Sequence, residues 1–224
     1  MTAADIFVDY VSWLRINVPF AYENLAPPAD SAELQALDAA IGYILPAEVK
    51  GVLAIRNGQK TITTGPNSGH GVPCIPTLNF LSTTEIREHH ESWSEIRRGS
   101  DIEDLQQMGG VFPGAEGMIK PLYTSPGWIP LWSDPISDDY IGLDLDPGPT
   151  GTTGQIINFG RDEERHFLCA PDFTRLMSIL LEEVLSGVWQ ASQITSSTSE
   201  GEKTHPWFGD PEEHFFNALY ARFK

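Results

Sequence analysis

Basic residues are scarce in this 224-residue chain, which has 14 Lys and Arg against 31 Asp and Glu and a net charge of −17. Nucleic-acid binding needs clustered Lys and Arg against the phosphates, so this balance argues against a nucleic-acid-binding protein. It favours a basic partner, because the field of an acidic protein attracts such a partner over a distance. Plain solubility is the alternative explanation of the charge.

Cysteine and long apolar runs are also scarce. Cys74 and Cys169 could form one disulfide at most, and we favour two reduced, buried thiols in a cytoplasmic protein. No segment approaches the roughly 20 apolar residues of a membrane span. The N-terminus has no basic start before an apolar core, so we expect neither a signal peptide nor membrane contact.

Catalytic and cofactor-binding motifs are equally sparse. The loop Gly148–Gly154 (GPTGTTG) lacks the Lys-Ser/Thr ending of a phosphate-binding loop, so we interpret it as a hairpin connection. His89 and His90 are adjacent and cannot form an i, i+4 ligand pair on a helix. We therefore expect no cofactor and no enzymatic activity. A Cys–His pair that meets only in space stays open as an alternative.

What the chain does contain is material for a core: 41% of its residues are hydrophobic, and they include six Trp and eleven Phe. Turn residues separate four short apolar runs, a pattern that predicts an antiparallel meander. The runs are Gly127–Trp132, Tyr140–Leu145, Gln155–Phe159 and His166–Cys169.

Helical spacing surrounds this sheet. Phe173, Leu176, Leu180 and Val184 recur at i, i+3, i+7 and i+11 and predict a helix over Asp172–Gly187. Capping patterns and apolar periodicity predict further helices before the sheet. These run from about residue 5 to 16, 30 to 41, 46 to 57 and 82 to 98.

Short motifs in this order resemble the SUKH superfamily, which includes the fungal Smi/Knr cell-wall assembly regulators and many bacterial immunity proteins. The resemblance covers roughly Leu45 to Val184 and implies a single SUKH-like α+β domain with an antiparallel or mixed sheet. The matching motifs are Leu45-Pro46, Asn57-Gly58, Ile129-Pro130-Leu131, Asp139-Tyr140, Leu143-Asp144-Leu145-Asp146-Pro147, Gly154-Gln155-Ile156-Ile157 and the helix around Phe173.

We divide the chain into three parts. Residues 1–189 form the SUKH-like domain, and the Ser- and Thr-rich residues 190–209 form a polar linker or loop. Residues 210–224 form an extra C-terminal amphipathic helix, which docks either on this chain or on a partner. If it mediates self-association, the protein is a homodimer; otherwise it is a monomer.

Carboxylates and aromatic side chains gather in the middle of the sheet region. Such a mixture suits a surface that binds a basic protein, although Asp is also common in turns. Asp144 and Asp146 share one face of a strand and could alternatively hold Mg²⁺ or Ca²⁺, as in a hydrolase. The predicted partner contacts are Trp132, Asp134, Asp138, Asp139, Tyr140, Asp144 and Asp146.

The resemblance and the charge together suggest an immunity protein. Such a protein would neutralise a cognate bacterial toxin, a basic protein such as a nuclease, by covering its active surface. The alternative, implied by the fungal relatives, is a non-enzymatic regulatory scaffold of the cell-wall assembly regulator type.

Overall fold

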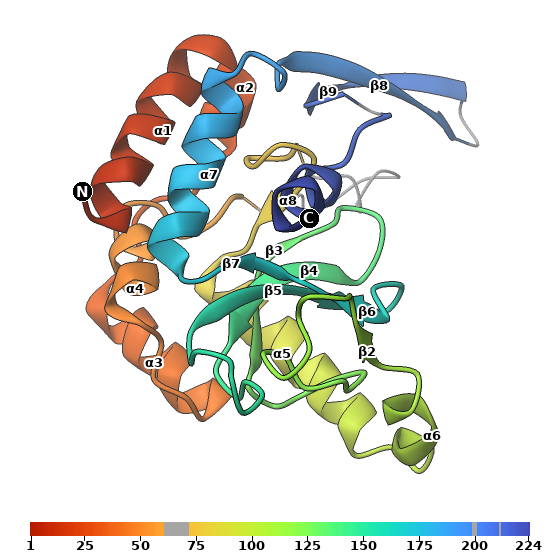
Figure 1. The fold of residues 1–224 in the computed structure, drawn as a ribbon. Coiled ribbons are helices and arrows are strands. Elements are labelled where there is room, and N and C mark those ends of the chain that lie inside the picture. The colour runs from red at the N-terminus through yellow and green to blue at the C-terminus, as the bar shows by residue number, and fades with distance from the viewer. Residues whose placement is uncertain (61–71, 199–200, 211) are drawn as a thin grey trace.

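The structure is a computed structural model that describes residues 1–60, 72–198, 201–210 and 212–224. Figure 1 shows a central sheet with helices on both sides and a β-hairpin that projects from the body. The α+β class predicted from the sequence is confirmed, since helices both precede and follow an antiparallel sheet of five strands.

The central sheet has the order β1-β3-β4-β5-β7, and each neighbouring pair of strands is antiparallel. The first three predicted runs form β3, β4 and β5, and the fourth divides between β6 and β7. Every residue of β3, β4 and β5 is buried. The strands are β1 (Asn79–Phe80), β3 (Trp128–Ser133), β4 (Asp139–Asp144), β5 (Gln155–Gly160), β6 (Arg165–His166) and β7 (Leu168–Ala170).

Two helices cover the two faces of this sheet (Figure 1). The helix α5 (Thr83–Arg97) contacts β3, and α7 (Phe173–Leu185) contacts β5 and β7. Ser82 and Glu85 form the predicted capping box of α5, and the Asp172 side chain accepts a hydrogen bond from the backbone N–H of Arg175 at the start of α7.

The N-terminal helices pack outside α7 and α5. The helix α1 lies along α7, and α3 contacts α5. Capping boxes formed by Thr2 with Asp5 and by Asp30 with Glu33 begin α1 and α3. The four helices are α1 (Ala3–Asn17), α2 (Pro19–Asn24), α3 (Ser31–Ile41) and α4 (Ala47–Leu53).

A smaller layer follows α5 in the chain. The short helix α6 (Ile102–Gln106) leads to β2 (Gly110–Val111), which pairs in parallel with β6. His166 of β6 is fully buried, and its two ring nitrogens lie 3.1 Å from the carbonyl oxygen of Asn158 and 2.7 Å from that of Leu122. These contacts fasten the segment after α6 to the sheet.

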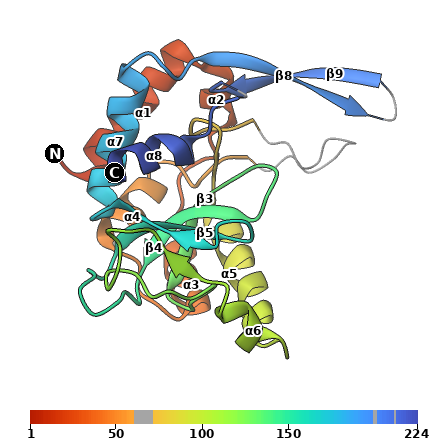
Figure 2. The same cartoon turned by 45° about the vertical axis from the view of Figure 1, so that its right-hand side comes forward.

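The prediction of a polar linker or loop over residues 190–209 is wrong. The described residues of this stretch form an antiparallel hairpin of β8 (Ala191–Thr198) and β9 (Gly201–Phe208), which extends away from the body in Figure 2. Polar composition suggested a linker, but Thr is favourable in strands, and two aromatic residues anchor the base. Trp207 and Phe208 are 6% and 0% exposed, and the Phe208 carbonyl oxygen accepts a hydrogen bond from the backbone of Thr77 at 2.8 Å.

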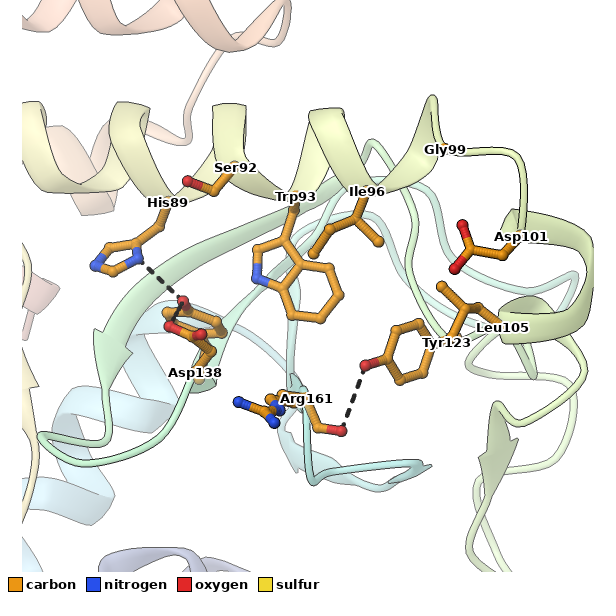
Figure 3. Close-up of a pocket in the computed structure, with 11 residues that line it drawn as sticks. His89, Ser92, Trp93, Ile96, Gly99, Asp101, Leu105, Tyr123, Asp138 and Arg161 are labelled. Carbon is orange, nitrogen blue, oxygen red and sulfur yellow. Dashed lines mark hydrogen bonds between the residues drawn. The ribbon is translucent and has the colours of Figure 1, made fainter.

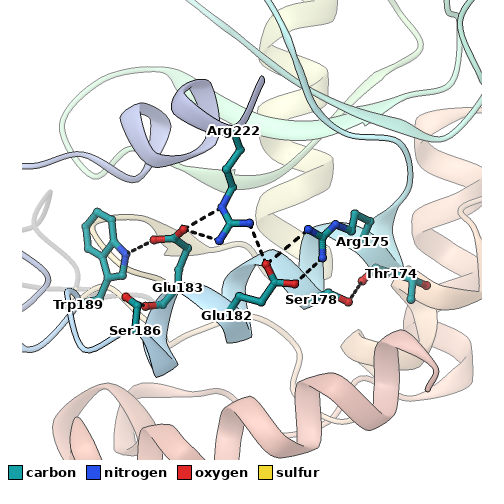
Figure 4. Close-up of polar contacts among 8 residues, drawn as sticks. All are labelled: Thr174, Arg175, Ser178, Glu182, Glu183, Ser186, Trp189 and Arg222. Carbon is teal, nitrogen blue, oxygen red and sulfur yellow. Dashed lines mark hydrogen bonds and ion pairs between the residues drawn. The ribbon is translucent and has the colours of Figure 1, made fainter. Parts of the chain in front are cut away.

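The C-terminal helix α8 (Phe215–Phe223) begins five residues later than the sequence suggested and docks on its own chain. Phe215 and Leu219 are fully buried, and the Phe215 ring packs against Trp132. Figure 4 shows that Arg222 ties α8 to α7: its guanidinium binds Glu182 and Glu183, each at 2.8 Å. A partner is therefore not needed to cover this apolar helix.

Gly142 marks the tightest point of the sheet. It lies in β4 opposite Pro130 of β3 and Ile157 of β5. A Cβ atom at this position would lie 2.1 Å from the carbonyl oxygen of Ile129 and 2.9 Å from the ring of Phe159. Only glycine fits there without a shift of the neighbouring strand.

We expect Gly142→Ala to lower the free energy of unfolding by about 1–3 kcal/mol, because the added methyl group overpacks the sheet. Gly51→Ala, inside α4, is the matched control. A Cβ atom at position 51 would lie at an ordinary 3.7 Å from its nearest neighbour, the Cβ of Ala4. Alanine should raise helix stability there by a few tenths to about 1 kcal/mol. Urea denaturation measures the free energy of unfolding of both variants, and equal values for the two would contradict this account of the sheet.

Candidate functional site

Four of the seven predicted contact residues are buried. Trp132 and Tyr140 are 1% exposed, Asp144 is fully buried and Asp139 is 8% exposed. A partner cannot reach these side chains in this conformation, so the predicted acidic and aromatic face does not form one surface. The sequence argument placed these side chains on a binding surface, whereas α5 on one side and α7 with α8 on the other cover the sheet.

The other three predicted contacts are Asp134, Asp138 and Asp146. Asp134 accepts a hydrogen bond from the His214 ring at 2.7 Å, and Asp146 forms an ion pair with Lys120. Burial alone would raise the pKa of Asp134, but hydrogen bonds from His214 and from the backbone of the following turn lower it. Asp138 alone of the seven is well exposed.

Asp144 and Asp146 do not form an open metal site. The Asp144 carboxylate accepts hydrogen bonds from Gln155 Nε2 at 2.9 Å and from the backbone N–H of Asp146 at 3.0 Å. Burial raises the pKa of Asp144 to about 6 despite these bonds. No group of three or more possible His, Cys, Asp or Glu ligands occurs among the residues that the structure describes. These two aspartates join the ends of β4 and β5 and the neighbouring loop.

A cavity of about 380 Å³ lies between α5, α6 and the edge of the sheet, and we call it the α5 pocket. Its size falls within the range of small-molecule and side-chain binding sites. Figure 3 shows the residues that line it. They are His89, Ser92, Trp93, Ile96, Gly99, Asp101, Leu105, Tyr123, Asp138, Tyr140 and Arg161.

One face of α5 supplies the largest part of the wall. His89, Ser92, Trp93 and Ile96 stand at i, i+3, i+4 and i+7, so the helix presents them together. Tyr140 of β4 faces them across the cavity. The remaining walls come from α6, from the segment before β3 and from the turns before β4 and after β5. Residues from 89 to 161 therefore meet only in the folded chain.

Three aromatic rings stand at steep angles in this wall. The Trp93 ring centroid lies 5.6 Å from that of Tyr123 with an interplanar angle of 59°, and 6.4 Å from that of Tyr140 at 79°. His89 adds a fourth ring, 5.2 Å from Tyr140. Tyr140 packs edge to face with both Trp93 and His89, Tyr123 is tilted against Trp93, and these contacts hold Trp93 in place where it borders the cavity (Figure 3).

The polar centre of the pocket is the Tyr140 hydroxyl. It lies 3.0 Å from His89 Nδ1 and donates to Asp138 Oδ1 at 3.3 Å. Burial, followed by the charge of Asp138, raises the pKa of Tyr140, and burial lowers the pKa of His89. At neutral pH the phenol is therefore protonated and the imidazole uncharged, so these groups offer hydrogen bonds and not an activated nucleophile.

The turn after β5 carries Arg161 into the pocket. Its backbone N–H donates to the carbonyl oxygen of Asp138 at 3.0 Å, and its own carbonyl oxygen accepts from Tyr123 at 3.4 Å. Glu163, two residues further, accepts a hydrogen bond from Asn158 of β5. Burial raises the pKa of Glu163 to about 7, and the charge of Asp139 acts in the same direction.

Two of the predicted contact residues, Asp138 and Tyr140, thus line the pocket, and the other five do not. The sequence argument missed His89, Trp93 and Arg161 as site residues. The sequence analysis considered His89 only as a possible ligand beside His90 and did not single out Trp93, and no sequence signal linked either residue to Arg161. Both cysteines are buried, as predicted.

Comparison with known proteins supplies the family. The SMI1 / KNR4 family (SUKH-1) matches residues 28–179, which include the sheet, α5 and the whole α5 pocket. The chain belongs to the SMI1/KNR4 family. The superfamily resemblance drawn from the short motifs is therefore confirmed, and the match begins before Leu45, where the motifs had placed it.

Several similar proteins come from fungi. The cell wall biosynthesis/cell cycle regulator smi1 of Schizosaccharomyces pombe is 27% identical over 193 residues, which are 83% of this chain and 36% of that protein. The glucan synthesis regulatory protein of Neurospora crassa is 24% identical over 215 residues, covering 82% and 38%. The cell wall assembly regulator SMI1 of Saccharomyces cerevisiae is 38% identical over 71 residues, covering 32% and 14%. This SMI1/KNR4 chain spans about a third of the first two relatives.

These relatives overturn the toxin-immunity prediction, because the curated proteins that match are fungal Smi1/Knr4 regulators. The short motifs are shared by the fungal regulators and the bacterial immunity proteins. The acidic net charge led us to prefer the immunity proteins, and that preference was wrong. Among the residues that the structure describes, none of the helices has the length and apolar character needed to span a membrane.

We expect Glu163→Gln to remove a pH dependence of stability. The pKa of Glu163 is about 7 in the folded chain, against a usual 4.5, so the folded state holds this proton more tightly. The wild-type protein therefore loses stability from Glu163 as the pH rises from about 4.5 to 7. Glutamine can still accept the bond from Asn158 and carries no charge.

Chemical denaturation at pH 5 and pH 8 measures this effect. The variant should match the wild type at pH 5 and exceed it at pH 8 by about 1–2 kcal/mol, allowing for partial exposure of the side chain. Glu164→Gln, an exposed neighbour on the same turn, is the control and should show no such difference. Parallel pH profiles for the Glu163 variant and the wild type would contradict the assignment.

Proposed function

We propose that this SMI1/KNR4 chain is a non-enzymatic regulatory module of the cell-wall assembly regulator type, and that it acts by binding other proteins. The observation that carries the proposal is the match over more than four-fifths of the chain to proteins named as regulators of cell-wall biosynthesis and glucan synthesis. The family match over residues 28–179 includes every residue of the α5 pocket, since they lie between residues 89 and 161.

The character of the pocket supports a binding role. Its aromatic rings are held by mutual packing, and burial raises the pKa of Tyr123 and Tyr140 further above neutral pH, so both hydroxyls are hydrogen-bonding groups. A rigid, half-apolar cavity with a few polar groups is typical of sites that recognise a ligand or side chain. We place the protein in the cytoplasm, where the thiols of Cys74 and Cys169 stay reduced.

A domain exchange tests this function. In S. pombe cells, the segment of smi1 that matches this chain is replaced by residues 1–224, with deletion of the same segment as the reference. We expect the exchange to restore growth on a wall-binding dye and resistance to wall-digesting enzymes, because the module supplies the same contacts. Growth assays and immunoblots for protein level measure the outcome.

Two matched variants make the result specific. An exchange that carries Gly51→Ala should restore growth like the unmodified chain, whereas one that carries Gly142→Ala should lose function together with protein level. If the unmodified chain accumulates to the level of the native protein and growth is not restored, the proposed regulatory function is wrong.

A further inference from the structure

We infer that the α5 pocket binds an arginine side chain presented by a partner polypeptide. This inference rests on the proposed function, because it names the chemistry that a partner of the regulatory module would offer. It draws on the ring geometry, on the charges at the rim and on the position of Arg161.

The dimensions of the cavity fit one long side chain. Its volume of about 380 Å³ lies near the lower end of the range for ligand sites, too small for a helix or a strand of a partner. The cavity opens between α5 and the turns that carry Asp138 and Arg161, as Figure 3 shows. An extended segment of a partner could lie across this opening and insert one side chain.

The aromatic rings in the wall favour a cation. The faces of Trp93, Tyr123 and Tyr140 carry the negative part of the ring quadrupole, and tryptophan attracts cations most strongly. The steep angles between them, 59° and 79°, border one space from several directions. A planar guanidinium can stack on such a ring and donate hydrogen bonds in its plane, whereas an ammonium group acts as a point charge.

The charges around the pocket also favour a cation. Asp101 and Asp138 line it, and Asp138 is within hydrogen-bond distance of the Tyr140 hydroxyl. Burial raises the pKa of Tyr123, the charge of Arg161 lowers it, and the nearby carboxylates of Asp162 and Glu164 raise it. The net charge of −17 adds a long-range attraction for a basic partner.

Arg161 contributes a positive charge to the pocket, and removing that charge distinguishes a cationic occupant from an anionic one. Within the described part of the chain, its guanidinium takes part in no hydrogen bond or ion pair, although its backbone is fixed on both sides. An incoming arginine would be repelled by this charge and would displace the exposed side chain. An anionic occupant would depend on it. The two kinds of occupant therefore predict opposite effects of removing Arg161.

The test uses short acetylated and amidated peptides with a single arginine, lysine or citrulline among Gly and Ser. Citrulline has the shape of arginine without its charge. Binding to the ¹⁵N-labelled full chain is followed by NMR through the indole N–H of Trp93, assigned by the loss of one of the six indole signals in Trp93→Phe. We expect the arginine peptide to shift this signal, the lysine peptide to bind several-fold more weakly and the citrulline peptide to leave it unchanged.

Three charge variants complete the experiment. Asp138→Asn should weaken arginine binding about tenfold, the effect of losing one close charge in a partly desolvated site. Arg161→Gln should tighten it. Asp104→Asn removes an exposed charge from α6 outside the pocket and should change little. Thermal unfolding of each variant confirms that the fold persists.

The inference is overturned if the arginine peptide does not shift the Trp93 signal, if citrulline binds as well as arginine, or if Asp138→Asn has no effect. A loss of binding in Arg161→Gln would indicate an anionic occupant and would also overturn it. The growth assay of the domain exchange tests the proposed function separately. If growth is restored but no arginine peptide binds, the regulatory function stands and the inference of an arginine occupant is wrong.

Discussion

The burial of β4 on both faces is the constraint on which the rest of the structure depends. Tyr140 points toward α5, where it meets His89 and Trp93, whereas Trp132 on the neighbouring strand packs against Phe215 of α8. The strand can be covered on both sides because Gly142 lets β3 and the Phe159 ring approach its backbone. The α5 pocket lies at the edge of this double layer, where α5 and α6 meet the turns before β4 and after β5.

The same constraint explains why acidic residues in the sheet are structural. Asp144 bonds to Gln155 and to the backbone of Asp146, and Asp134 holds His214 just before α8. A buried carboxylate is costly unless donors surround it, and these positions provide the donors. Exposed acidic residues occur on several elements, α1, α3 and α4 among them, and at the pocket itself they are Asp101 and Asp138. Charge at this rim, in an SMI1/KNR4 module, is suited to selecting partners more than to holding the fold together.

Local patterns predicted much of the fold. The meander, the capping boxes and the apolar stripe of α7 depend on neighbours in the sequence, and the family motifs fixed their order. The exposed or buried state of Asp139 and Tyr140 could not be predicted, because it depends on which helices cover the sheet. The hairpin at 191–208 was missed because its polar strands resemble a linker in composition. The pocket was missed because Trp93 and Arg161 are distant in sequence and meet only through the fold.

The central claim is that this SMI1/KNR4 module acts through the α5 pocket, supported by a core that does not itself contact partners. A saturation scan of residues 28–179 in the yeast domain exchange, with growth and protein level read for every substitution, tests it most directly. The account predicts that substitutions which lower growth at normal protein level cluster at the rim of the pocket, as at Asp138 and Arg161. Core substitutions such as those at Gly142 should lower both. A cluster elsewhere on the surface, or growth that follows protein level at every position, would contradict the claim.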